Sequence, residues 1–185
     1  TDRHVPTWDG ELYLEYHRGT YTSQARNKKN NRKTELKLRE AEWLASEAAV
    51  KTGDFSSYPA KDFHEAWKIA LRNQFHDIIP GSSIHEVYED STEEYRKANE
   101  ILDAIEKNAL KVLTRDATST VTVVNNSSFA GEGIVTVKGF EDKEGSWLSA
   151  DGKELPAVRT ENGWLVKVSG VEPTGFTTLT FKEGT

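Results

Sequence analysis

A histidine followed directly by an aspartate is the residue pair of this chain best suited to chemistry. Residues 73–83 read NQFHDIIPGSS, so an apolar-striped segment leads to His76 and Asp77 before Pro-Gly breaks the chain. A neutral imidazole is a common metal ligand, and a neighbouring carboxylate can orient it or bind a polar substrate. One imidazole and one carboxylate do not complete a metal site. Any chemistry here therefore requires groups from elsewhere.

The direction of His76 follows from the apolar stripe that precedes it. The stripe comprises Phe63, Ala66, Trp67, Ala70, Leu71, Gln74, Phe75 and Ile78. At about 100° per residue, a helix reaching that far places His76 opposite the stripe, so that it points away from the core. Two interpretations remain open. His76 is either a solvated histidine near a helix C-terminus, favoured by the helix dipole, or a ligand that completes a metal site in a missing domain.

The remaining polar clusters indicate no second site. His64 and His85 lack a second ligand at helical spacing, and no His-x-x-x-His or Glu-x-x-His pair occurs in the chain. The basic run 28–33 has no interleaved aromatic residues, and we interpret it as a solvated helix face. The acidic residues between Glu86 and Glu94 are interpreted in the same way.

The first two thirds of the chain has helical periodicity. The clearest pattern is a seam with alternating steps of four and three residues: Ile84, Tyr88, Ser91, Tyr95, Ala98, Leu102, Ile105, Ala109 and Val112. Ser83 and Glu86 have the spacing of a capping box at its start. A helix from about 23 to 50 ends at Gly53, and the next begins near Pro59. We expect the first helix to bury Leu36, Ala41, Trp43, Leu44, Ala48 and Val50. These features predict an antiparallel three-helix bundle over residues 23–117.

From residue 118 the period changes to two. Alternating segments at 120–124, 133–137, 164–168 and 176–181 are separated by turn-forming Asn-Asn, Asp-Gly and Asn-Gly pairs. About five or six antiparallel strands are expected over residues 118–185. They would form a small sheet or the start of a larger β-sandwich, so the expected fold class is α + β in separate domains.

Composition excludes several classes of function. The 185 residues contain no cysteine, which rules out disulfides and thiolate chemistry and fits a reducing compartment without requiring one. A net charge of −6 argues against nucleic acid as the main partner, and no apolar run is long enough to span a membrane. The chain also lacks methionine and begins at Thr1. We therefore expect an excised piece of a longer protein, with residues 1–22 leading in from a missing domain.

Three segments resemble one enzyme family in the same order. Residues 73–88 resemble the helix-bundle signature of family 38 glycoside hydrolases, the class II α-mannosidases. Residues 10–25 resemble the stretch before that bundle, and residues 124–129 resemble the start of the β-rich region that follows. The resemblance implies a middle fragment that lacks the catalytic barrel of a three-part enzyme.

The resemblance also implies a zinc ion, bound mainly by barrel residues and by one bundle histidine that matches His76. Asp77 matches an aspartate that contacts the mannose hydroxyls. His17 matches a position near the sugar, which is Trp in the Golgi and lysosomal relatives. The resemblance also implies a substrate-binding role for Tyr21. Phe75 stands where those relatives have a second histidine. This departure and Pro80-Gly81-Ser82 resemble the bacterial and cytosolic branch, which implies a cytoplasmic location.

The implied reaction is retaining hydrolysis of terminal α-mannosides by two barrel carboxylates. The chain would contribute a zinc ligand and a sugar-binding carboxylate and would be inactive alone. Its implied partners are the barrel and further β domains of its own protein, and a homo-oligomer is left open. The alternative is a non-catalytic helical interaction module with a carbohydrate-binding β domain that uses Trp147 or Trp164. A purely structural interpretation of those tryptophans is that they pack the sheet.

Overall fold

The computed structural model describes residues 4–11, 18–114 and 118–184, which form two compact units. The first unit comprises residues 1–42 and 59–105, and the second comprises residues 43–58 and 106–185. The expected domain boundaries at 22/23 and 117/118 stay predictions, and residues 115–117 lie outside the described residues.

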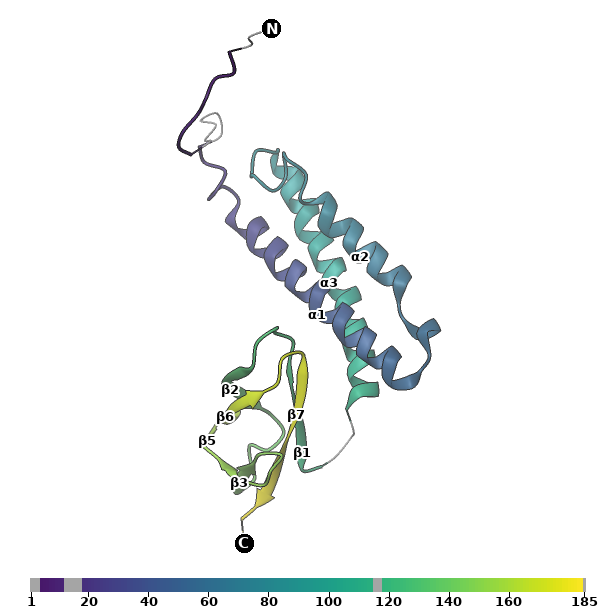
Figure 1. The fold of residues 1–185 in the computed structure, drawn as a ribbon, viewed down its shortest axis with the longest axis vertical. Coiled ribbons are helices and arrows are strands. Elements are labelled where there is room, and N and C mark those ends of the chain that lie inside the picture. Colours follow the sequence, from purple (N-terminus) through teal and green to yellow (C-terminus); the bar gives the residue numbers. More distant parts are fainter. Residues whose placement is uncertain (1–3, 12–17, 115–117, 185) are drawn as a thin grey trace. The chain divides into compact units, whose positions relative to one another are not determined.

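Three long helices form the helical part, and successive helices run in opposite directions (Figure 1). They are α1 (Ala25–Thr52), α2 (Ala60–Arg72) and α3 (His85–Leu113), with a short 3-10 helix, η2 (Phe55–Ser57), between α1 and α2. Gly53 has a φ of +70°, a conformation that glycine adopts at little cost, and it follows the last residue of α1 as expected. The predicted antiparallel three-helix arrangement is confirmed.

Small and aromatic side chains fill the centre of the first unit. Its fully buried residues include Leu38, Ala41, Ala66, Ala70, Tyr95, Ala98 and Leu102. The alanines let the helices approach closely, and the seam predicted for α3 is buried from Tyr88 to Ala109. The indole N–H of Trp67 on α2 also donates to Glu42 Oε1 on α1 over 2.6 Å.

Six residues assigned to the apolar stripes are instead exposed: Leu36, Val50, Leu71, Phe75, Ile84 and Val112. Leu36 lies two positions from the buried Leu38, and Val50 two positions from the buried Ala48. Two positions turn a helix by about 200°, so both members of such a pair cannot face the core. The stripe predicted through Phe75 was wrong because α2 ends at Arg72.

The β part of the second unit consists of seven strands in the described residues, one or two more than expected. They are β1 (Thr120–Asn125), β2 (Gly131–Val137), β3 (Gly145–Leu148), β4 (Glu154–Leu155), β5 (Ala157–Thr160), β6 (Gly163–Val171) and β7 (Gly175–Glu183). One sheet has the order β1-β7-β3-β4 and the other has the order β2-β6-β5, with antiparallel pairing throughout.

The two sheets share one hydrophobic core rich in aromatic rings. Trp147 and Phe181 come from the first sheet and Trp164 from the second. The Phe181 ring lies 5.1 Å from the Phe140 and Trp147 rings and 5.8 Å from the Trp164 ring, centroid to centroid. Trp147 is 0% exposed and Trp164 is buried. Edge-on aromatic contacts of this kind stabilise a core. The two tryptophans therefore pack the sheets, as the structural interpretation predicted, and neither ring is exposed for binding a sugar.

None of the helices in the described part of the chain is long and apolar enough to span a membrane.

Candidate functional site

His76 and Asp77 lie on a compact loop, residues 73–84, that joins α2 to α3; we call it the site loop. Asn73 caps α2, with its N–H donating to Ile69 O. The loop then turns on main-chain hydrogen bonds from Ile78 N and Ile79 N to Phe75 O, at 2.9 and 3.1 Å. Gly81 follows with a φ of +91°, which explains why glycine stands after Pro80. The site loop is thus built from repeated turns rather than a continuation of α2.

The His76 and Asp77 side chains both face solvent and touch each other. The imidazole Nε2 lies 3.3 Å from Asp77 Oδ2, and the two side chains are 76% and 59% exposed. The Phe75 ring lies 4.2 Å from the imidazole, centroid to centroid. The expected outward direction of His76 is therefore confirmed, although a turn rather than a helix presents it. The pair offers one nitrogen ligand and one carboxylate acceptor at an accessible surface.

Helix α3 holds the site loop through Tyr88, whose side chain is buried. The N–H of Ser83 donates to the Tyr88 hydroxyl over 3.0 Å, and that hydroxyl lies 3.3 Å from Ile78 O as a donor. The Ser83 hydroxyl donates to Asp77 O over 2.5 Å. Because α3 begins at His85, two residues after the predicted capping residue, Ser83 serves to close the site loop. These bonds fix the main chain immediately after His76.

Helix α1 holds the same loop from the other side. Asn27, which is buried, donates from Nδ2 to Ile78 O over 3.3 Å, and Lys28 Nζ donates to Ile79 O over 2.9 Å. Ser91 on α3 donates to Asn27 Oδ1 over 2.6 Å and so fixes the orientation of the amide. Sequence reasoning assigned Lys28 to a solvated face and did not single out Asn27. An isolated helical pattern gives no signal for either contact, since both partners lie 51 residues away.

A second polar network lies beneath the start of the site loop. Asn73 is 1% exposed and donates from Nδ2 to Glu94 Oε2 over 2.7 Å. Gln74 Nε2 donates to Asn31 Oδ1 and Glu35 Oε1, at 3.1 and 2.9 Å. Part-buried networks of this kind restrict the arrangement of the groups that they join. The network therefore fixes how the site loop leaves α2.

Burial raises the pKa of Tyr95, on α3 below this network, with a further contribution from the nearby carboxylates of Glu35 and Glu94. The neutral phenol is the form that can donate, and its hydroxyl lies 3.2 Å from Asn31 Oδ1. Tyr95 therefore remains a hydrogen-bond donor to the network at neutral pH.

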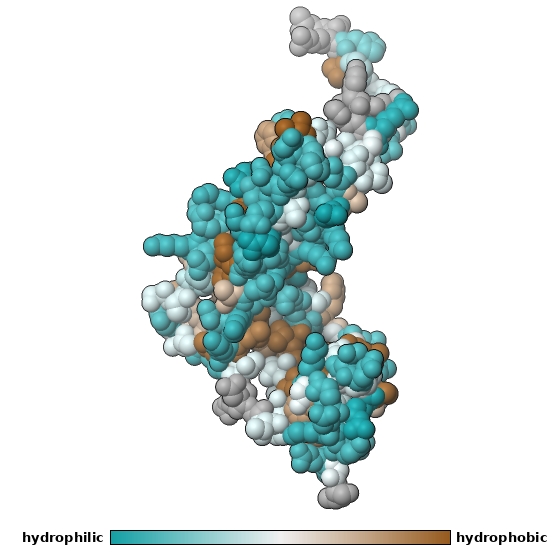
Figure 2. Space-filling model, turned by 180° about the vertical axis from the view of Figure 1, so that it is seen from behind, coloured by the Kyte–Doolittle hydropathy of each residue, from teal (hydrophilic) through white to brown (hydrophobic). Residues whose placement is uncertain are grey.

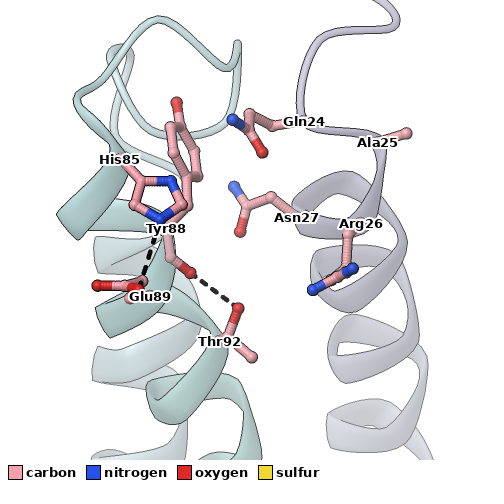
Figure 3. Close-up of a pocket in the computed structure, with 8 residues that line it drawn as sticks. All are labelled: Gln24, Ala25, Arg26, Asn27, His85, Tyr88, Glu89 and Thr92. Atoms are coloured by element: carbon pink, nitrogen blue, oxygen red, sulfur yellow. Dashed lines mark hydrogen bonds and ion pairs between the residues drawn. The ribbon is translucent and has the colours of Figure 1, made fainter.

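A groove opens between the first turns of α1 and α3 (Figure 3). It has a volume of about 630 Å³ and is lined by Gln24, Ala25, Arg26, Asn27, His85, Tyr88, Glu89 and Thr92. Its His85 and Glu89 side chains approach to 3.4 Å. Asn27 and Tyr88 line the groove and also form hydrogen bonds with the site loop.

Of the two further predicted substrate residues, Tyr21 and His17, the structure describes only Tyr21. Tyr21 lies exposed in a turn before α1, where Ser23 N donates to Gly19 O over 2.8 Å. This turn approaches the site loop closely, because a Cβ built on Gly81 would lie 2.7 Å from Ser23 Cβ and 2.8 Å from Ser23 O. His17 lies outside the described residues.

The described residues do not by themselves hold a metal ion. Within residues 4–11, 18–114 and 118–184, no group of three or more His, Cys, Asp or Glu side chains is placed for that purpose. An exposed imidazole beside a carboxylate nevertheless has the donor types that zinc accepts. His76 can therefore act as one ligand of a site whose remaining ligands lie elsewhere.

The fold matches part of two larger solved structures from Enterococcus faecalis, a protein in the glycosyl hydrolase family 38 and an alpha-mannosidase. The TM-scores are 0.74 and 0.72 at sequence identities of 21% and 20%, and each alignment covers 90% of this chain. It covers 25% and 24% of the solved chains. This similarity defines the fold class, a helical bundle followed by β-sheets of the kind contained in those structures.

Residues 15–113 match the model of the alpha-mannosidase middle domain, so the chain belongs to the alpha-mannosidase middle domain family. It is similar to an alpha-mannosidase of Saccharomyces cerevisiae, with 52% identity over 84 residues, and to alpha-mannosidase 2C1 of Mus musculus, with 46% identity over 89 residues. These alignments cover 45% and 48% of this chain. The chain spans 8% of the length of each of these relatives.

Proposed function

We propose that this chain forms part of the active site of a zinc-dependent, retaining α-mannosidase that hydrolyses terminal α-mannosides. Membership of the alpha-mannosidase middle domain family supports the enzyme class. The observation that carries the site is the exposed His76–Asp77 pair, held at 3.3 Å on a loop that two helices fasten. These contacts hold the main chain that carries the pair, which supports a fixed position for both side chains.

In this proposal His76 and Asp77 have different roles. The neutral imidazole of His76 donates one nitrogen lone pair to zinc, and the Asp77 carboxylate accepts a hydrogen bond from a sugar hydroxyl. Zinc, when bound, supplies a Lewis acid that holds sugar hydroxyl oxygens. Tyr21 contributes a further sugar contact, which its exposure and the closeness of Ser23 to Gly81 support. We also propose His17 as a sugar contact.

The nucleophile and the general acid, we propose, are two carboxylates of a catalytic barrel in the full-length protein. Exposed apolar side chains near His76 support a covering partner there. Phe75 and Ile84 are both more than half exposed, and Figure 2 shows hydrophobic surface at the end of the bundle that carries the site loop. Exposed apolar patches of this kind mark interaction surfaces. The resemblance of residues 75–82 to the bacterial and cytosolic branch supports a cytoplasmic location.

The proposal is tested in the full-length enzyme with His76→Ala. Bound zinc, measured by atomic emission, and turnover of a chromogenic α-mannoside should fall together. His64→Ala is the matched control, since it removes an exposed imidazole from α2 away from the site loop. Zinc content and turnover that stay at the wild-type level in His76→Ala would refute the proposal.

A further inference from the structure

The ammonium group of Lys28 joins two segments that are distant in sequence. Lys28 Nζ donates to the carbonyl oxygens of Ser23, at 2.5 Å, and Ile79, at 2.9 Å. Ser23 ends the turn that carries Tyr21, whereas Ile79 follows His76 and Asp77 in the site loop. The Lys28 side chain is half-buried, and burial lowers the pKa of Lys28. A group placed in this way is held by main-chain oxygens rather than left in solvent.

The same two segments meet without an intervening side chain. Gly81 packs so closely on Ser23 that an added Cβ would lie within 2.9 Å of three Ser23 atoms, two of them in the main chain. Asn27, the residue before Lys28, donates to Ile78 O, the carbonyl before that of Ile79. Two consecutive residues of α1 therefore bond two consecutive carbonyls of the site loop.

We propose that Lys28 is a positioning residue for the active site, fastening the Tyr21 turn and the His76–Asp77 loop to each other. The inference rests on the function proposed above and adds a residue that lies outside the site itself. An ammonium group suits this task because it carries three donors on a long stem, so it can reach two carbonyls at once. Charge-assisted bonds to both carbonyls restrict the main chain of the Tyr21 turn and of the site loop.

The test compares Lys28→Met with Lys28→Arg and Lys29→Met in the full-length enzyme. Lys28→Met keeps the apolar stem but removes the donors, and Lys28→Arg restores donors. Lys29→Met removes the same charge from the exposed neighbouring position. The first readout is hydrogen exchange of the amides in residues 78–83. It should speed up about tenfold in Lys28→Met and stay near wild type in the other two variants.

The second readout is bound zinc together with kcat/KM for a chromogenic α-mannoside. Both should fall in Lys28→Met, with kcat/KM about tenfold lower, and recover in Lys28→Arg. Unchanged exchange in Lys28→Met overturns the inference. Faster exchange in Lys28→Met with wild-type zinc content and wild-type kcat/KM also overturns the inference, provided that His76→Ala has lost both zinc and activity. If instead His76→Ala keeps both, the proposed function itself has failed.

Gly81→Ala provides an independent test of the inference if Lys28→Met does not fold. The variant keeps Lys28 but places a Cβ against Ser23 at a φ of +91°. It should accelerate exchange over the same residues and lower bound zinc. Exchange at the wild-type rate in Gly81→Ala would contradict the proposed fastening.

Discussion

The Ser91 hydroxyl lies 2.6 Å from Asn27 Oδ1, which joins α3 to α1 across 64 residues of sequence. Both side chains are buried, at 2% and 5% exposed. The hydroxyl donates to the amide oxygen, and this leaves the amide N–H of Asn27 directed at Ile78 O in the site loop. A hydroxyl in the middle of an apolar seam therefore orients a contact to the candidate site.

Ser91→Ala should lower the free energy of unfolding by about 1–3 kcal/mol, because the buried Asn27 oxygen loses its donor. Urea unfolding followed by circular dichroism measures the change. Thr92→Ala is the matched control, since Thr92 is an exposed residue whose hydroxyl donates within α3, to Tyr88 O over 2.8 Å. Equal stabilities of the two variants would show that the Asn27 contact contributes little.

Asp77→Asn in the full-length enzyme should lower kcat/KM for an α-mannoside by about ten- to a hundredfold while zinc stays bound. The amide keeps the shape of the side chain but loses the charge that strengthens a hydrogen bond from a sugar hydroxyl. Steady-state kinetics and metal analysis separate this result from that of His76→Ala. The control is Asp90→Asn, an exposed carboxylate on α3. Wild-type kinetics in Asp77→Asn would remove Asp77 from the site.

Gly163→Ala should destabilise the β part by about 2–4 kcal/mol, through backbone strain and a steric clash. Gly163 has a φ of +127°, and an added Cβ would lie 2.4 Å from Val137 O on the neighbouring strand. Thermal unfolding followed by the fluorescence of the buried tryptophans measures the loss. Gly133→Ala is the control, because an added Cβ there meets nothing within 4 Å. A Gly163→Ala transition at the Gly133→Ala temperature would contradict the clash.

Asp151 at the β3–β4 turn should titrate with a pKa of about 2. Hydrogen bonds from Lys153 and Ser149 lower its pKa from the ordinary value of 3.8. Because the folded-state pKa is the lower one, the stabilisation is present above pH 3.8 and is lost as the pH falls toward 2. Carboxyl carbon NMR of the folded chain measures the midpoint. Lys153→Met should raise this midpoint, whereas Lys182→Met should not, and equal midpoints would exclude the Lys153 contact.

Local patterns were sufficient to predict the three helices and four of the seven described strands, β1, β2, β6 and β7. The seam from Tyr88 to Ala109 is buried, and the Asp151-Gly152 pair lies between β3 and β4 as expected. The Asn162-Gly163 pair lies where β5 turns into β6, whose first residue is Gly163, and both glycines have positive φ. The burial of Leu36 and Phe75 was predicted wrongly. Apolar character alone cannot say which of two competing helix faces meets a partner, or where α2 stops.

The sequence by itself determined the helical and β halves, the break at Pro80-Gly81, and the choice of His76 and Asp77 as candidates. Each of these depends on the chemistry of neighbouring residues or on a short period. Only the tertiary structure decided that Asn27, Lys28, Tyr88 and Ser91 hold the loop carrying that pair. Their partners are carbonyl and hydroxyl groups brought together by helix packing. A main-chain carbonyl is the same in every residue, so no sequence pattern marks the one that a lysine will bind.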